Sequence, residues 1–151
     1  MTEATPFERL LKKRDLDKTT AIALVVDDDP QMAKLSARII ARLGIRTQTK
    51  EGGIPGLEAI RALQGRLALL LTDVNMPGME GTQMASTAGK EGLLIDVPVV
   101  FMTGKMWENL SKTQAVAAEG TPNEVIEKPF DIDGLVKAIQ RACEKVLQES
   151  A

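Results

Sequence analysis

Four apolar runs of the chain each end in polar residues that are suited to phosphoryl chemistry. They are Ala21–Val26 before Asp27 and Asp28, Leu67–Leu71 before Thr72 and Asp73, Val97–Met102 before Thr103, and Val125 and Ile126 before Glu127 and Lys128. Side chains at the ends of neighbouring parallel strands meet at one edge of a sheet, where open α/β folds place their sites. Together they would supply two adjacent acids, a single acid, a hydroxyl and an ammonium. This set suits Mg²⁺-dependent transfer of a phosphoryl group onto Asp73.

The adjacent acids Asp27 and Asp28 carry an electrostatic cost. Two like charges about 4 Å apart, at an effective dielectric constant of about 20, repel each other by about 4 kcal/mol. Asp73 would add to this repulsion, and a divalent cation would relieve it. Carboxylate oxygens in a chain without histidine suit Mg²⁺, with Mn²⁺ as a possible substitute. The backbone carbonyl of Asn75, in the turn after Asp73, could supply a further ligand, whereas Asp29 is explained as a helix cap.

Lys128 and Thr103 would complete the site. Lys128 precedes Pro129, which favours an extended conformation, and its compact charge suits phosphate oxygens. A threonine at a strand end is ordinarily neutral, so Thr103 gains a role only from the rest of the set. Each acid taken alone also has an ordinary interpretation, as a loop or capping residue.

Strand and helix patterns alternate along the chain. The expected strands are 21–26, 45–49, 67–72, 97–102 and 125–127, and the expected helices are 30–43, 55–65, 81–90, 110–119 and 131–147. Five such units predict an α/β fold, with a parallel sheet covered by helices on both faces. We expect one domain over 21–148 and a tail over 149–151.

Residues 1–20 form a polar lead-in in which Phe7, Leu10 and Leu11 have helical spacing. The favoured interpretation is a frayed arm, and the alternative is a short helix that docks on the domain or on a partner. We expect Trp107 in the loop after the fourth strand, where it either packs on the adjoining helix or anchors a partner. Cys143 is expected to pack in or near the core.

The composition excludes several functions. The 151 residues suit one domain with a short extension, and a net charge of −2 without a basic block argues against nucleic acid and anionic membranes. The absence of histidine excludes Ser–His–Asp catalysis and a phosphohistidine carrier. No apolar run spans a bilayer, the charged N-terminus lacks a signal peptide, and one cysteine excludes an internal disulfide, so the cytoplasm is the expected location.

The chain resembles the receiver domains of two-component response regulators, of the stand-alone type. The resemblance covers about residues 21 to 147 and rests on LVVDDDPQM, LLLTDVNMPGMEG, VVFMTGK and EKPF. It implies a doubly wound, flavodoxin-like sheet of five parallel strands in the order 2-1-3-4-5. The chain departs from many receivers at Val125, where a Tyr or Phe is usual three residues before the lysine.

The resemblance also implies roles for the strand-end residues. Asp73 would be the phosphoacceptor, and Thr103 and Lys128 would bind phosphoryl oxygens. Asp28 would be the principal Mg²⁺ ligand, joined by Asp73, by the Asn75 carbonyl and, through water, by Asp27. The phosphoryl donor would be a histidine kinase, a histidine phosphotransfer protein or a small molecule such as acetyl phosphate.

Output would pass through protein–protein contacts of the face formed by 110–119, 125–127 and 131–147, in a monomer or weak dimer without a separate catalytic domain. The alternatives are a phosphorelay intermediate, a phosphate sink, and a receiver-fold binding module that is not phosphorylated. A phosphohydrolase of the haloacid-dehalogenase type is disfavoured because Asn75, which cannot transfer protons, stands where such enzymes need a second acid.

Overall fold

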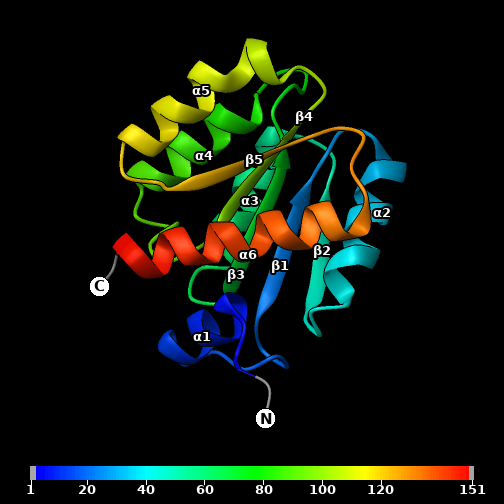
Figure 1. Cartoon of the computed structure of the whole chain (residues 1–151). Helices are drawn as coiled ribbons and strands as arrows, with labels where there is room; N and C mark the ends of the chain where they lie inside the picture. Colours follow the sequence, from blue (N-terminus) through cyan, green and yellow to red (C-terminus); the bar gives the residue numbers. More distant parts are fainter. Residues whose placement is uncertain (1–2, 150–151) are drawn as a thin grey trace.

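A computed structural model describes residues 3–149 and shows a twisted parallel sheet between two layers of helices (Figure 1). The strands are β1 (Ile22–Val26), β2 (Arg46–Lys50), β3 (Leu67–Asp73), β4 (Val99–Thr103) and β5 (Asn123–Glu127). They lie in the order β2-β1-β3-β4-β5, and all pairs are parallel. The predicted fold class and strand order are therefore confirmed, whereas the boundaries 21–148 stay a prediction and residues 150 and 151 of the expected tail lie outside the described part.

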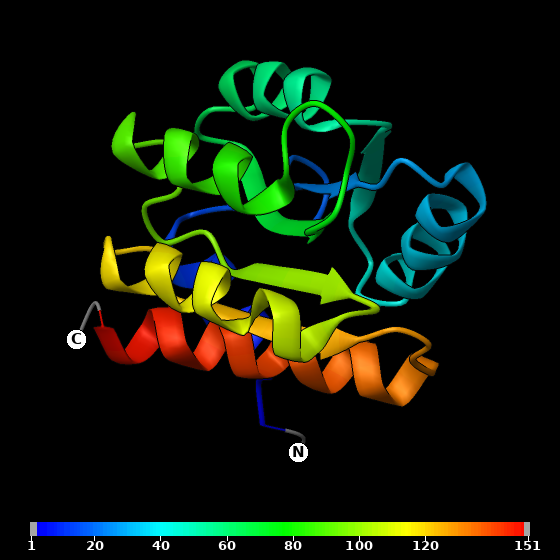
Figure 2. The same cartoon turned by 90° about the horizontal axis from the view of Figure 1, so that it is seen from above.

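Helices cover both faces of the sheet. They are α1 (Pro6–Lys13), α2 (Pro30–Ala41), α3 (Gly53–Ala62), α4 (Gly81–Lys90), α5 (Met106–Ala118) and α6 (Ile132–Glu149). One core cluster joins the sheet to α1, α2 and α6, and a second joins it to α3, α4 and α5. The view along the sheet shows α3 and α4 on one side and α6 on the other (Figure 2). Within the described residues, no helix is long and apolar enough to cross a membrane.

Burial explains which strands lie in the middle of the sheet. Every residue of β1, β3 and β4 is buried, as expected for strands covered on both faces. β2 has the polar sequence RTQTK and lies at one edge, and β5 lies at the other edge with partly exposed residues. Because all strand pairs are parallel, the carboxyl ends of these buried strands lie at the same edge of the sheet.

The strand register brings the carboxyl ends together. Val26 lies opposite Thr72, Asp73 opposite Met102, and Thr103 opposite Glu127. The residues that follow β1 and β5 and those that end β3 and β4 consequently share one edge of the sheet, as the sequence predicts.

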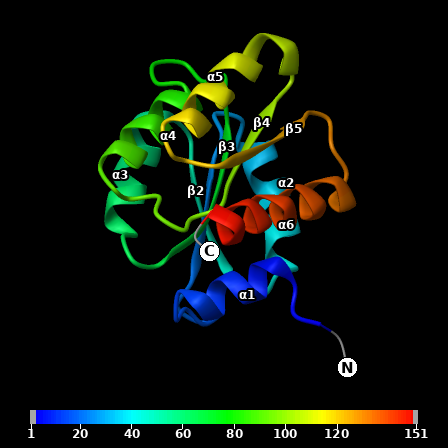
Figure 3. The ribbon, with the colours of Figure 1, turned by 60° about the vertical axis from the view of Figure 1, so that its left-hand side comes forward.

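The N-terminal segment is not the frayed arm that we favoured. Residues 6–13 form α1, whose Phe7, Leu10 and Leu11 are buried in the core cluster that includes α6. The backbone N–H of Phe7 donates to Gln140 Oε1 at 2.9 Å. α1 lies beside α6, at the end of the sheet opposite the carboxyl ends of the strands (Figure 3). An eight-residue helix is marginal alone, so docking rather than propensity stabilises it.

The expected starts of two helices and the expected surroundings of Trp107 are also wrong. α5 begins at Met106, not at residue 110, so Trp107 lies in the first turn of a helix and not in a loop. Its side chain is 89% exposed, which rules out the packing interpretation. α3 likewise begins at Gly53, before Pro55. The cap of α2 by Asp29 and the burial of Cys143 are confirmed.

The docking of α1 makes a stability prediction. Phe7→Ala removes a fully buried ring from the core, so the free energy of unfolding should fall by about 3 kcal/mol. Arg9→Ala, which removes an exposed ion pair with Glu144, is the matched control and should cost less than about 1 kcal/mol. Urea denaturation measures both, and equal losses in the two variants would contradict the docking of α1.

Candidate functional site

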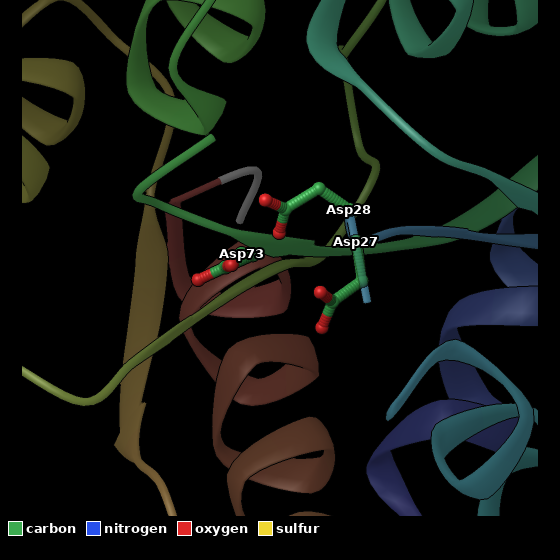
Figure 4. A group of neighbouring side chains, drawn as sticks. All are labelled: Asp27, Asp28 and Asp73. Carbon is green, nitrogen blue, oxygen red and sulfur yellow. The ribbon is translucent and has the colours of Figure 1, made fainter. Parts of the chain in front are cut away.

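Three carboxylates gather where β1 and β3 end (Figure 4). One oxygen each of Asp27, Asp28 and Asp73 lies within 4.8 Å of the others. Asp27 is fully buried, Asp73 is 7% exposed and Asp28 is exposed. The sequence placed these acids together, and the structure does the same.

Backbone contacts hold the two ends of this cluster. The Asp27 N–H donates to the Lys50 carbonyl of β2, and the Asp29 N–H donates to Asp27 Oδ1 at 2.9 Å. The turn after β1 is thereby fixed, with Asp27 buried and Asp28 exposed beside Asp73. After β3, a Cβ on Gly81 would lie 2.0 Å from the Asp73 carbonyl oxygen, so only glycine allows α4 to start this close to the strand.

Lys128 supplies the positive charge. Its Nζ lies 3.1 Å from Asp27 Oδ2 and 3.5 Å from Asp73 Oδ2. The backbone N–H of Lys128 donates to the Thr103 carbonyl at 2.8 Å, which extends the β4–β5 ladder and directs the side chain at the acids. The ammonium therefore contacts both the residue after β1 and the last residue of β3, although Asp27 and Asp73 are far apart in the sequence.

Thr103 is buried and belongs to a polar network that the sequence did not reveal. Its hydroxyl oxygen accepts from the Lys105 N–H at 2.9 Å and from Asn109 Nδ2 at 2.7 Å. Asn109 Nδ2 also donates to Asn75 Oδ1 at 2.6 Å. From the sequence we did not predict a role for Asn109, because we expected the helix to begin only at residue 110. Its role follows from its place near the start of α5, which begins at Met106.

The comparisons agree with this geometry. Residues 23–140 match the response regulator receiver domain family. The chain belongs to this family. It is thus a receiver domain of two-component signalling, a class in which an aspartate accepts a phosphoryl group.

Relatives include both regulators and kinases. The DNA-binding transcriptional regulator NtrC of Escherichia coli is 31% identical over 121 residues, which are 80% of this chain and 24% of NtrC. Hybrid signal transduction histidine kinase D of Dictyostelium discoideum is 28% identical over 118 residues, which are 78% of this chain and 7% of that kinase. The receiver thus spans a quarter or less of these two relatives.

Solved structures share the fold. Chemotaxis protein CheY4 of Vibrio cholerae superposes with a TM-score of 0.71 at 24% identity, over 82% of this chain and 99% of that one. A response regulator receiver domain from Clostridium thermocellum also gives 0.71, at 21% identity, over 85% of this chain and 98% of that one.

The environment of Asp73 in this receiver raises its pKa to about 6 from the usual 3.8. Burial is the main cause, and the neighbouring charges of Asp27 and Asp28 add to it, while Lys128 opposes it. Ionised Asp73 is therefore held at a cost when no cation is bound. That cost makes the carboxylate a receptive partner for a cation or an electrophile.

The raised pKa has a consequence for stability. Between about pH 4 and pH 6 the native carboxyl holds its proton more tightly than the unfolded one, so the Asp73 contribution to stability falls as the pH rises. With EDTA present, Asp73→Asn should stabilise the receiver by ~1–3 kcal/mol at pH 7.5. Thermal unfolding should show this gain disappearing near pH 4. Asp29→Asn, which keeps the helix cap, is the control; a gain in Asp73→Asn that does not depend on pH would contradict the assignment.

Proposed function

We propose that Asp73 accepts a phosphoryl group from a histidine kinase or a histidine phosphotransfer protein, in a Mg²⁺-dependent reaction, and that other proteins read the modified domain. The observation that carries this proposal is the convergence of Asp73, two further acids and Lys128 at one edge of the sheet. Family membership supports the reaction class, and the side-chain geometry supports the proposed roles.

The reaction is an in-line displacement at phosphorus. An oxygen of the Asp73 carboxylate forms the new O–P bond, while the bond from phosphorus to the donor nitrogen, or to the oxygen of acetyl phosphate, breaks and its electron pair leaves with the donor. Lys128 stays near the developing negative charge and stabilises it electrostatically. Water later attacks phosphorus, which releases inorganic phosphate and restores the carboxylate.

The donor set fits Mg²⁺. The cluster offers hard carboxylate oxygens, and the chain contains no histidine. Asp27 has both oxygens engaged, one by the Asp29 N–H and one by Lys128, which suits contact through water. Asp28 has no hydrogen bond or ion pair within the described residues and is the available principal ligand, beside Asp73 and the Asn75 carbonyl. A bound cation would neutralise charge on these acids and on the phosphoryl oxygens.

Output through the face of α5, β5 and α6 is part of the proposal. These three elements correspond to the face that we expected from the sequence, formed by residues 110–119, 125–127 and 131–147. Val125 is half-buried and packs on the core cluster of α3, α4 and α5, opposite Phe101. Because Val125 stands where many receivers have a Tyr or Phe, the usual aromatic switch is absent. We therefore propose that α5 itself changes position when Asp73 is phosphorylated. The same phosphoryl chemistry would serve a relay or a sink, and we expect it in the cytoplasm.

Phosphorylation is tested by intact mass. Incubation with acetyl phosphate and Mg²⁺ should add one phosphoryl group, and EDTA should abolish the gain. Asp73→Asn should gain none because the nucleophilic carboxylate is lost, whereas Asp29→Asn, two residues from Asp27, should be labelled like the wild type. A phosphoryl gain that survives Asp73→Asn would contradict the site.

Beryllofluoride provides a second, donor-independent test. With Mg²⁺ it should bind the wild type in place of a phosphoryl group, and fluorine NMR reports the bound anion. Failure of both acetyl phosphate and beryllofluoride would refute the proposed function.

A further inference from the structure

We propose that Asn109 is a latch on the switch of this receiver: it holds the Thr103 hydroxyl and the Asn75 amide in their resting arrangement. It must release Thr103 before that hydroxyl can bind a phosphoryl group on Asp73. Asn109 is a positioning residue, because it acts through Thr103 and does not touch the acids. The inference rests on the proposed function in one respect, that Asp73 is the phosphoacceptor.

Asn109 joins three parts of the site. It lies near the start of α5 and is 1% exposed. Its amide nitrogen has two hydrogens and two short acceptors, Thr103 Oγ1 at the end of β4 and Asn75 Oδ1 in the loop after Asp73. Its own oxygen faces Asn75 Nδ2 at 3.4 Å. A buried amide with both N–H groups in use is a specific arrangement, not a solvated helix start.

The hydroxyl of Thr103 is committed to this network. Both of its acceptor positions are filled, by the Lys105 N–H and by Asn109. For its own proton, the described residues offer only Asn75 Oδ1, at a long 3.5 Å. Among residues 3–149 it makes no hydrogen bond to Asp73. Thr103 is therefore turned toward α5, and binding a phosphoryl oxygen requires it to reorient.

Reorientation of Thr103 has a cost that Asn109 sets. If Thr103 leaves alone, a buried N–H of Asn109 loses its partner, which costs more than the hydrogen bond itself gains. If Asn109 follows, it moves the first turn of α5, where Trp107 lies 89% exposed. In either case Asn109 favours the resting state, so its removal should raise the population of the activated state.

The test replaces Asn109 with an apolar side chain of similar size. Asn109→Leu should bind beryllofluoride about 2- to 10-fold more tightly than the wild type in the presence of Mg²⁺, the range expected for loss of one neutral hydrogen bond. Fluorine NMR measures the bound fraction, and the fluorescence of Trp107 reports the first turn of α5. Asn109→Ala should change the affinity in the same direction and serves if the leucine variant does not fold.

Two controls separate a latch from a merely structural residue. In a Thr103→Val background Asn109 keeps its bond to Asn75 but no longer restrains the hydroxyl that would bind the phosphoryl group. Adding Asn109→Leu there should leave the affinity unchanged, and an equal effect in both backgrounds would overturn the proposal. Asn123→Leu removes another buried asparagine, whose amide binds the carbonyls of Thr113 and Thr121. It should destabilise the fold without tightening the binding of beryllofluoride.

The two proposals fail in different ways. A wild type that binds neither beryllofluoride nor a phosphoryl group refutes the proposed function. A wild type that binds, with Asn109→Leu and Asn109→Ala binding equally or more weakly, refutes the latch alone.

Discussion

The ammonium of Lys128 between Asp27 and Asp73 is the interaction on which the site depends. A fully buried carboxylate needs a partner, and removal of one member of a buried pair costs about 3–5 kcal/mol. Lys128 directly follows the edge strand β5, and its Nζ lies 3.1 Å from Asp27 Oδ2 and 3.5 Å from Asp73 Oδ2. The register of β4 and β5 is therefore an electrostatic requirement as well as a packing result, because one residue of slip would withdraw the only cation facing the buried acids within the described part of the chain.

A single ammonium does not neutralise three acids. The raised pKa of Asp73 is consistent with that imbalance: burial, its main cause, and the two neighbouring carboxylates together outweigh Lys128. The site is thus held in a charged state that is ready for a cation and an electrophilic phosphorus. Close backbone contacts at Gly81 and Asp29 hold these charged side chains in place. The stability of the rest of the fold therefore offsets the electrostatic repulsion among the acids.

The part of the site that we propose to respond to phosphorylation is built differently from the part that we propose to react. Asp27 directly follows β1 and Asp73 ends β3, two central strands with every residue buried. Thr103 and Asn75 are instead joined through one asparagine to the start of α5. That helix start carries an exposed tryptophan. At the opposite end of the sheet, α1 adds apolar contacts to α6 and lies away from the reactive edge. The buried acids and the proposed response are consequently carried by different elements.

The strand order was expected from the resemblance to receiver domains. The sequence by itself predicted the strands and the residues at their ends: the acids, Thr103 and Lys128. The reason is that buried strands need continuous apolar runs, and the residue that ends each run is read directly. The tertiary structure alone decided that α1 docks, that α5 begins at Met106 and that Trp107 is exposed. These features arise from contacts between distant segments, such as Phe7 with Gln140 and Asn109 with Asn75. The local conformational preference of a short helix or a single polar side chain is too weak to predict such contacts. They contribute to stability only once the chain is folded.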